Sequence, residues 1–473
     1  MNKKILSYCL FVIVLCLAVY LRVYRLGGMY SYNYDEGVYA ESGKMVALGY
    51  LPFNDFFSGQ PPHFSILIGV FFRLLGINIF SARLFIVLTS LLCIMSVYFI
   101  AKEAGSQAVL PSDNCAGLLS AFFLSISPLF VNQSRIVQSE VPSIAFVLLG
   151  VLLFLRARRY NNPLYYFISG IFISLGIMMK LNVGIALVLI IGCFITSKGV
   201  RGAIFFIAGC IIPLLILPIF NFNKMIDQMI IYHLSKPAIY KFSDRILWIW
   251  ETLNSDIGLF ISFIAGVVLC IMKKRFDGIF IVILSCAFFL FCLFYRALFP
   301  HHTTILIPLM SILSGIGISY LFTIPRVKIR RGILFIIFLS YGIYSMWLIK
   351  KDIDFISQND NPYYVDVVKV ISSRVNENEY ILTDEQIISF FANKRLPSDF
   401  VDTSNYRIIT KYLSSEMLID ACKQYNVKMV IISSSRFVKL KEFIKYVRTN
   451  YELIKEYKKG RFVYIKKSES NNL

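Results

Sequence analysis

The apolar run that decides the fold is LFIVLTSLLCIMSVYFIA, which occupies Leu84–Ala101 and contains no charged residue. A helix needs roughly 20 consecutive apolar residues to cross a hydrocarbon core about 30 Å thick. The whole chain of 473 residues is 57% apolar and only 16% charged. Soluble proteins are about half apolar and about a quarter charged. The sequence therefore predicts an integral membrane protein made of α-helices.

Apolar segments of this kind recur along the chain as far as Leu348. The third to sixth of them are short for complete crossings, and together the segments predict a polytopic α-helical membrane protein with about 11 spans. In order, they are Ile5–Tyr24, Leu84–Ala101, Ala116–Val131, Pro142–Leu155, Leu164–Met179, Val183–Thr196, Ala203–Phe220, Ile257–Met272, Gly278–Tyr295, Thr303–Phe322 and Gly332–Leu348.

The distribution of Lys and Arg predicts the orientation, because cytoplasmic loops carry an excess of both. Ile5–Tyr24 is followed by no small-residue cleavage site, so we expect it to remain as the first span. The N-terminus is predicted to be cytoplasmic, and an odd number of spans places everything after Lys350 outside. Every second connection between the spans is basic and is predicted to be cytoplasmic. The basic residues are Lys3 and Lys4, Lys102, Arg156 to Arg159, Lys198 with Arg201, Lys273 to Arg275, and Arg326 to Arg331.

The formal net charge of +20 could suggest a nucleic-acid partner. The basic residues instead lie in short clusters between apolar runs, and no nucleic-acid recognition motif is present, so no such partner is expected. Most of the ten cysteines lie in apolar segments, and none forms a CxxC pair. A zinc site is therefore not indicated.

The last part of the chain, residues 351–473, has a different composition. It lacks a glycine-rich loop for phosphate, so we predict a small extracytoplasmic α/β domain that caps the protein or contacts the acceptor, and not a cofactor-binding domain. Helical patterns at Tyr363–Arg374, Ser415–Tyr425 and Lys439–Asn450 alternate there with β-rich runs at Tyr380–Thr383, Val427–Ile432 and Phe462–Ile465.

A long outside loop, residues 27–81, contains the acidic pair Asp35-Glu36. Two stretches within it, Glu36–Leu48 and Phe64–Leu75, have the pattern of helices that lie along the membrane surface. Taken alone, Asp35-Glu36 is explained by the preference of acidic residues for the first turn of a helix. A carboxylate at this position could also accept the proton of a sugar acceptor. The surrounding residues favour the second interpretation.

Those residues resemble, in order and spacing, the first external loop of the GT-C glycosyltransferases. The most similar branch contains the protein O-mannosyltransferase-like enzymes and the lipid A aminoarabinose transferases. The likeness is specific as far as Ile100, weaker but collinear over the later spans, and loose in the tail. The matching stretches are Tyr34-Asp35-Glu36-Gly37-Val38-Tyr39-Ala40, Gly49 to Phe57, Gln60-Pro61-Pro62, Leu75-Gly76 and Ala82-Arg83-Leu84.

The resemblance implies a membrane enzyme with a GT-C fold. Such an enzyme moves a hexosyl or pentosyl group from a polyprenyl phosphate to a lipid, glycan or protein acceptor outside the membrane, with inversion. Residues 1–350 would form the catalytic transmembrane domain, with the catalytic motif in residues 27–81. No cofactor is expected, although a divalent cation could bind if the candidate carboxylates converge.

Site residues are also implied by the resemblance. Asp35 corresponds to the catalytic base or acceptor anchor, Glu36 is its neighbour, and Glu140 lies where the family often has a second external-loop carboxylate. Tyr39 corresponds to a tyrosine that helps to hold the donor phosphate. Gln60 is a departure, since many relatives have Lys before the paired prolines, and a neutral amide brings no charge.

Another cation must therefore meet the donor phosphate. The candidates are Lys180, Arg135, Arg296 and the adjacent His301 and His302. Each also has a plain structural interpretation. Lys180 can extend from a helix end to the headgroups, and the segment from Arg296 to His302 can anchor the ninth span at the interface.

Two functions of other classes are compatible with a polytopic chain. A lipid or glycan transporter or flippase would usually keep ionisable residues in mid-membrane, whereas the centres of the predicted spans lack Asp, Glu, Lys and Arg. A scaffold that only presents the tail would not need the acidic pair and Gln60-Pro61-Pro62 together. Both alternatives are less favoured than glycosyl transfer.

Overall fold

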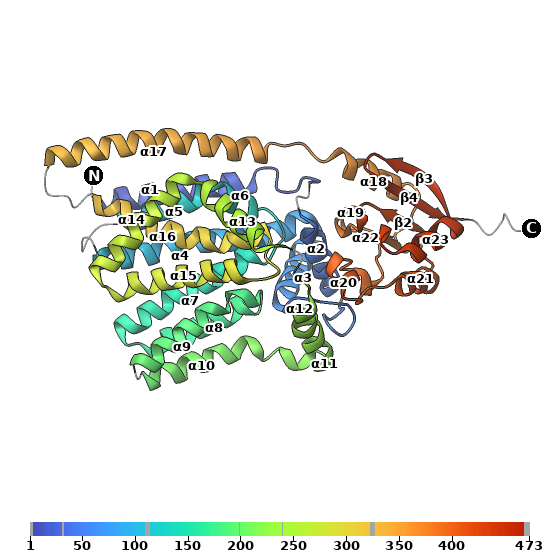
Figure 1. Cartoon of the computed structure of the whole chain (residues 1–473), viewed down its shortest axis with the longest axis horizontal. Coiled ribbons are helices and arrows are strands. Elements are labelled where there is room, and N and C mark those ends of the chain that lie inside the picture. Colours follow the sequence, from blue (N-terminus) through green and yellow to red (C-terminus); the bar gives the residue numbers. More distant parts are fainter. Residues whose placement is uncertain are drawn as a thin grey trace, which may run out of the picture. The chain divides into compact units, whose positions relative to one another are not determined.

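The computed structural model describes residues 3–30, 33–108, 114–197, 199–238, 240–321 and 327–467, and it consists mainly of α-helices (Figure 1). The predicted polytopic membrane protein is confirmed, since six helical segments in the described ranges are long and apolar enough to cross a bilayer. The helices that carry these segments are α1 (Lys3–Val23), α4 (Ile79–Ala108), α7 (Glu140–Tyr160), α10 (Val200–Leu214), α15 (Phe276–Phe294) and α16 (Leu306–Leu321), the last preceded by the 3₁₀ turn η4 (Pro300–Ile305).

Other apolar helices are shorter or bent. The pair α13 and α14 would form one further span but bends by 94° at its break. The number of crossings therefore stays a prediction, and Lys198, Phe322 and Arg326 of the predicted loops and spans lie outside the described residues. The helices concerned are α13 (Phe242–Asn254), α14 (Ile257–Lys273), α5 (Cys115–Ile126), α8 (Pro163–Ile177) and α9 (Ile185–Ser197), and the long α17 spans Val327–Ile356.

The chain forms two compact units. The first, here called the helical unit, contains Met1–Leu26, Leu84–Ile216 and Pro237–Gln358. The second, called the mixed unit, contains Gly27–Arg83, Leu217–Lys236 and Asn359–Leu473. The predicted first external loop thus folds in the same unit as most of the tail.

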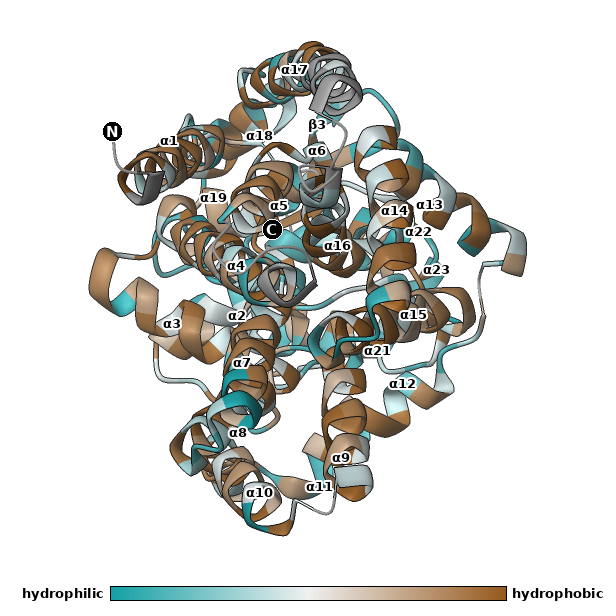
Figure 2. Ribbon diagram, turned by 90° about the vertical axis from the view of Figure 1, so that its left-hand side faces the viewer, coloured by the Kyte–Doolittle hydropathy of each residue, from teal (hydrophilic) through white to brown (hydrophobic). Residues whose placement is uncertain are grey.

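Close contacts between backbones hold the helical unit together. Its long helices run in nearly the same direction in Figure 1, and Figure 2 colours them mostly as hydrophobic. Helices α8 and α10 approach closely at two glycines: a Cβ on Gly170 would lie 2.1 Å from the oxygen of Phe206, and one on Gly209 would lie 1.9 Å from the oxygen of Phe167. Small residues permit such contact where apolar burial does not drive association, as in lipid.

The mixed unit contains a four-stranded sheet in the order β1-β2-β4-β3. β1 and β2 are parallel, and the other neighbours are antiparallel. Leu382 and Val430 from the sheet pack with Phe443 and Val447 from a covering helix in one buried core. The strands are β1 (Ile381–Thr383), β2 (Met429–Ile432), β3 (Tyr451–Tyr457) and β4 (Arg461–Lys466), and the helices of the tail are α18 (Pro362–Ser372), α19 (Gln386–Phe391), α20 (Asn405–Ile409), α21 (Ser415–Gln424), α22 (Ser435–Val438) and α23 (Lys441–Asn450).

Three predicted helices and three predicted strands of the tail are confirmed by α18, α21, α23, β1, β2 and β4. The sequence pattern did not reveal β3. Its residues, YELIKEY, carry charges at Glu452, Lys455 and Glu456 without a clear alternation, because β3 lies at the edge of the sheet and only Tyr451 is buried.

Two helices of the external loop complete the mixed unit. The helices expected at Glu36–Leu48 and Phe64–Leu75 are present as α2 (Tyr34–Ala47) and α3 (His63–Leu75). Their placement at the membrane surface stays a prediction. Helix α2 packs against α3 and against α19, where a Cβ on Gly37 would lie 2.3 Å from the backbone nitrogen of Ile387. Only glycine allows the first turn of α2 to come this close to the C-terminal segment.

Candidate active site

Asp35 lies in the first turn of α2 and is half-buried. The side chain of Asn33 caps this helix by accepting a hydrogen bond from the backbone N–H of Asp35, at 3.0 Å. A carboxylate at this end of a helix is stabilised in its charged form by the exposed N–H groups and the helix dipole. The residue that the sequence singled out as a base is thus held at a defined helix terminus.

Glu36 has a different environment, although it is the next residue. Its carboxylate forms a bidentate ion pair with Arg83, at 2.8 Å from Nε to Oε1 and 3.1 Å from Nη2 to Oε2, and both side chains are completely buried. The same guanidinium donates to the carbonyls of Gly28 and Tyr30, at 2.9 and 2.6 Å. Such paired, charge-assisted bonds fix geometry strongly. Glu36 and Arg83 therefore lock the chain that leads into α2.

Of the predicted donor-side residues of the same unit, Tyr39 lies on α2 and Gln60 lies just before α3. The ring of Tyr39 meets the ring of Phe64 edge to face, with centroids 4.8 Å apart. Gln60 is half-buried, and its backbone oxygen accepts a hydrogen bond from the hydroxyl of Ser58 at 3.0 Å. Both residues stay candidates for the donor phosphate.

Lys236, which the sequence analysis did not single out, is linked through His233 to Gly59, the residue before Gln60. His233 Nε2 bonds the carbonyl of Gly59, and because a carbonyl only accepts, Nε2 carries the proton. Nδ1 is then free to accept from the ammonium of Lys236, at 3.1 Å. The same ammonium lies 4.4 Å from the ring centroid of Tyr232. Nothing in the local sequence indicated that His233 would contact Gly59, which lies 174 residues earlier.

In the helical unit, four predicted residues come together. Glu140 at the start of α7 forms an ion pair with Lys180, and its Oε1 lies 3.4 Å from His301 Nε2 and 3.8 Å from His302 Nε2 in η4 (Pro300–Ile305). All four side chains are buried. Glu140 Oε2 has no hydrogen-bond partner among the described residues. The sequence named these residues separately and the fold brings them into one cluster.

Only some residues of this cluster have an atom placed to bind a metal ion. Ligand atoms of Glu140, His301 and His302 lie within 4.8 Å of one another. However, His302 Nδ1 accepts the backbone N–H of Phe299 at 3.0 Å, so a neutral ring carries its proton on Nε2, the atom that faces Glu140. A metal ligand needs a bare nitrogen. Glu140 and His301 are therefore ready ligands, and the ammonium of Lys180 beside them favours an anion.

The other two candidate cations lie elsewhere. Arg296 is exposed and makes no hydrogen bond or ion pair with any residue that the structure describes. Arg135 is buried and donates to the carbonyls of Leu21, Arg22 and Tyr24, at 2.7 to 3.1 Å. These carbonyls lie in the last turn of α1 and just after it, where the helix supplies no partners. Arg135 therefore caps α1.

Residues 59–222 match the family described as dolichyl-phosphate-mannose-protein mannosyltransferase. No curated protein sequence matches the chain significantly.

Solved structures match over nearly the whole chain. ArnT from Cupriavidus metallidurans, bound to undecaprenyl phosphate, matches with a TM-score of 0.67 and 12% identity over 99% of both chains. The archaeal oligosaccharyltransferase AglB from Archaeoglobus fulgidus, in complex with an inhibitory peptide and a dolichol-phosphate, matches with a TM-score of 0.57 and 13% identity over 98% of this chain and 75% of that chain. Another AglB structure from Archaeoglobus fulgidus, in complex with Zn and sulfate, has the same TM-score and identity over 97% and 73%.

These findings confirm the resemblance that the first external loop indicated: the chain has the fold of the GT-C membrane glycosyltransferases and carries, in residues 59–222, a match to one of their families.

Proposed function

We propose that this chain is an inverting glycosyltransferase that moves a sugar from a polyprenyl-phosphate carrier to an acceptor on the extracytoplasmic face of the membrane. The observation that carries the assignment of roles is the contrast between a half-buried Asp35 at a helix N-terminus and a neighbouring Glu36 that is fully paired inside. The family match supports glycosyl transfer. The undecaprenyl and dolichol phosphates bound to ArnT and AglB support a polyprenyl-phosphate donor.

In the proposed reaction, Asp35 accepts the proton of the acceptor hydroxyl or amine. The acceptor atom forms a bond to the anomeric carbon as the bond from that carbon to the phosphate oxygen breaks. The electron pair of the broken bond stays on the leaving polyprenyl phosphate, which gains negative charge. Glu36 keeps the loop in place through Arg83 and takes no proton.

Cations must stabilise the charge that develops on the leaving phosphate. In the mixed unit, Tyr39 and Gln60 would contact the donor, and Lys236 supplies the charge that Gln60 lacks. In the helical unit, Lys180 and His302 carry N–H groups around Glu140, His301 lies beside them, and the exposed Arg296 adds charge nearby in sequence. We propose each set separately as a contact for an anionic phosphate.

A divalent cation is a second proposal for the same cluster. Glu140 and His301 would hold it, and His302 would join after exchanging its proton between ring nitrogens. A bound ion would stabilise charge on the leaving phosphate as a Lewis acid. The presence of Zn in one AglB complex supports testing this idea. Transfer in the presence of a chelator, with and without added divalent ions, measures the requirement.

The decisive test replaces Asp35 by Asn in cells that otherwise lack the chain. Mass spectrometry of surface glycans and lipid-linked sugars identifies the product that the unaltered chain restores. We expect the Asp35→Asn variant to lose about 100-fold or more of this product, as is typical when a catalytic base is removed. Asp420→Asn, an exposed carboxylate change on α21, is the matched control. Full product formation by Asp35→Asn at equal membrane abundance would refute the role of Asp35.

Transport of a lipid or glycan is the less favoured function. It predicts counterflow of a labelled lipid-linked sugar in proteoliposomes without any glycosidic product. Product formation that depends on Asp35, without counterflow, separates the two functions.

A further inference from the structure

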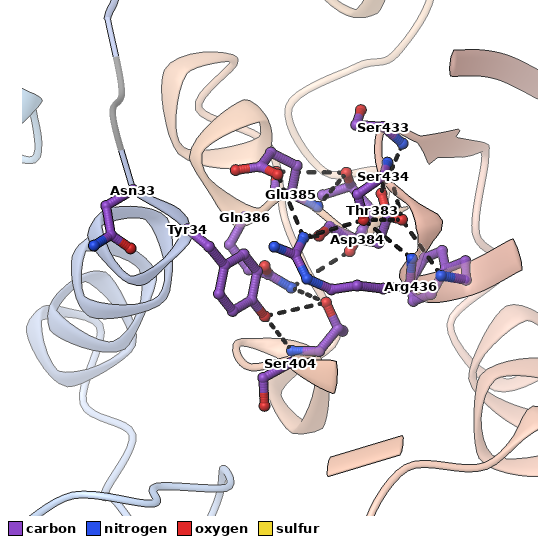
Figure 3. A network of polar contacts seen from close by, with 12 residues as sticks. Asn33, Tyr34, Thr383, Asp384, Glu385, Gln386, Ser404, Ser433, Ser434 and Arg436 are labelled. Carbon is purple, nitrogen blue, oxygen red and sulfur yellow. Dashed lines mark hydrogen bonds and ion pairs between the residues drawn. The ribbon is translucent and has the colours of Figure 1, made fainter. Parts of the chain in front are cut away.

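The carboxyl ends of the parallel strands β1 and β2 meet at one edge of the sheet, and an internal carboxylate occupies this edge. Asp384 follows β1, and Ser433 and Ser434 follow β2 (Figure 3). Asp384 Oδ1 accepts the backbone N–H of Ser433 at 2.7 Å, and Oδ2 accepts the hydroxyl of Ser434 at 2.7 Å. Open α/β sheets usually bind ligands at this edge. Here the chain fills the position itself, which fixes the loop after β2.

Arg436 extends from that fixed loop. Its guanidinium donates to the backbone oxygen of Asp384 at 2.5 Å and lies 3.4 Å from a carboxylate oxygen of Glu385. The guanidinium carbon also lies 3.6 Å from the ring centroid of Tyr34. A planar guanidinium stacks well on an aromatic face, which an ammonium cannot reproduce. Arg436 thus holds the ring of Tyr34 from one side (Figure 3).

The hydroxyl of Tyr34 is held as firmly as its ring. It accepts the backbone N–H of Thr403 at 2.7 Å and donates to Asp402 Oδ1 at 3.2 Å. Burial and the neighbouring Asp402 carboxylate raise the pKa of Tyr34 well above its ordinary value, so the hydroxyl keeps the proton that it donates. All these partners of Tyr34 belong to the C-terminal segment of the mixed unit.

Tyr34 is the first residue of α2, and the next residue is Asp35. We infer that Tyr34 and Arg436 are positioning residues, through which the C-terminal segment sets the direction of the Asp35 carboxylate. This inference rests on the proposed role of Asp35 and gives the tail a part in the reaction. Neither side chain needs to touch the substrate.

Other contacts should keep α2 docked when Tyr34 or Arg436 is changed. Further along the helix, Lys44 Nζ donates to the carbonyl of Lys394 at 2.8 Å, and Ser389 Oγ donates to Glu41 at 2.7 Å. A substitution at the first turn should therefore loosen that turn without releasing the helix. Activity and folding can then be separated.

The test compares Tyr34→Phe and Arg436→Gln with the unaltered full-length protein in lipid nanodiscs. The donor is the lipid-linked sugar that accumulates in cells lacking the chain. Lys439→Gln is the control, because Lys439 lies just after α22 and its exposed side chain donates to the side chain of Asn405, away from Tyr34 in sequence. We expect kcat to fall by about 10- to 100-fold in both variants, as misplacement of a reacting group by about 1 Å can do. KM for the donor and the melting temperature should stay unchanged.

A local measurement accompanies the kinetics. Hydrogen–deuterium exchange of a peptide covering residues 33–40 should quicken in both variants and stay unchanged in Lys439→Gln. Arg436→Lys, which keeps the charge but not the stacking, should show an intermediate kcat. An unchanged kcat in Tyr34→Phe and Arg436→Gln would overturn the inference, and so would a loss of activity that only follows a loss of folded protein. The same assay includes Asp35→Asn. If that variant is inactive while Tyr34→Phe and Arg436→Gln keep their kcat, only the inference about the two positioning residues is wrong, and the proposed function is not contradicted.

Discussion

Two adjacent carboxylates on α2, those of Asp35 and Glu36, lie in different environments. Asp35 is half-buried at the helix terminus, and Glu36 is buried against Arg83 with two hydrogen bonds. Side chains at neighbouring positions of a helix point in different directions, about 100° apart, so one can face the interior while the other reaches the surface. The pair therefore divides into a half-buried carboxylate, which we propose as the base, and a buried carboxylate that fixes the loop.

Replacing Glu36 by Gln tests this division. The change leaves the Arg83 guanidinium buried without its counter-charge, and breaking a buried ion pair in this way costs about 3–5 kcal/mol. We expect a clear fall in the melting temperature of the purified protein, measured by intrinsic fluorescence in detergent. Asp35→Asn should melt like the unaltered protein. A Glu36→Gln variant with normal stability and no transfer would instead make Glu36 a catalytic group.

At the scale of elements, helices in this protein meet through small residues and through buried polar pairs. Gly170 and Gly209 bring the backbones of α8 and α10 together in the helical unit. In the mixed unit, Glu41 and Lys44 join α2 to the C-terminal segment by hydrogen bonds to Ser389 and Lys394. Each kind of contact predicts a different response to substitution.

Gly209→Ala should weaken the pairing of α8 and α10. The added Cβ would lie 1.9 Å from a backbone oxygen, which no side-chain rotation can relieve. Overpacking of this kind typically costs about 1–3 kcal/mol. Gly192→Ala is the control, because a Cβ there meets nothing within 4 Å. Thermal unfolding should separate the two variants, and equal melting temperatures would contradict the close packing of α8 on α10.

The pH dependence of stability tests the environment of Glu41. Burial raises the pKa of this carboxyl above its ordinary value, although Lys44 and the hydroxyl of Ser389 act in the opposite direction. Because the folded protein then holds this proton more tightly than the unfolded chain, Glu41 removes stability as pH rises from about 4.3 through the folded pKa. The Glu41→Gln variant has no titrating carboxyl at this position, so it lacks this loss of stability with rising pH.

The melting temperature of Glu41→Gln relative to the unaltered protein should therefore increase as pH rises through this range. Other titrating groups cancel in the comparison of the two proteins. A difference that stays constant with pH, or one that decreases, would show that the pKa of Glu41 is not raised.

At the scale of the whole molecule, the external loop and the tail are parts of one compact unit. Gly27–Arg83 and Asn359–Leu473 are far apart in sequence but share the mixed unit with Leu217–Lys236. The division into a catalytic domain of residues 1–350 and a separate tail stays a proposal, and the shared unit supports a closer link between the motif and the tail. Such a link requires both segments to lie on the same side of the membrane.

Topology labelling tests this requirement. A cysteine introduced at exposed Asp55 in the external loop and another at exposed Asp420 in the tail should both react with a membrane-impermeant maleimide in intact cells. The distribution of basic residues predicts this result, because it predicts a cytoplasmic N-terminus and an outside location for both segments. Each cysteine is introduced into a variant from which the native cysteines have been removed. That variant without an introduced cysteine is the control and should not react. Reaction of either site only after the cells are opened would contradict the orientation and the proposed function with it.

The local sequence determined many of the elements of this protein, although not the edge strand β3. Uncharged runs such as Leu84–Ala101 predict helices because a bilayer offers the backbone no hydrogen bonds, and the alternating patterns of the tail predict β1, β2 and β4. The spacing of Tyr34-Asp35-Glu36, Gln60-Pro61-Pro62 and Arg83 was enough to indicate the GT-C class. These signals lie within one segment of the chain, where periodicity and motif spacing can be read directly.

The tertiary structure alone decided which of these residues meet. Glu140 contacts Lys180 and the histidines at 301 and 302, Lys236 reaches Gly59 through His233, and Arg436 stacks on Tyr34. The charged groups look alike in the sequence, whether they are buried partners or exposed surface. Their roles differ because the packing of distant segments sets the burial of each side chain and its distance to a partner. Neither quantity can be predicted from the local sequence pattern.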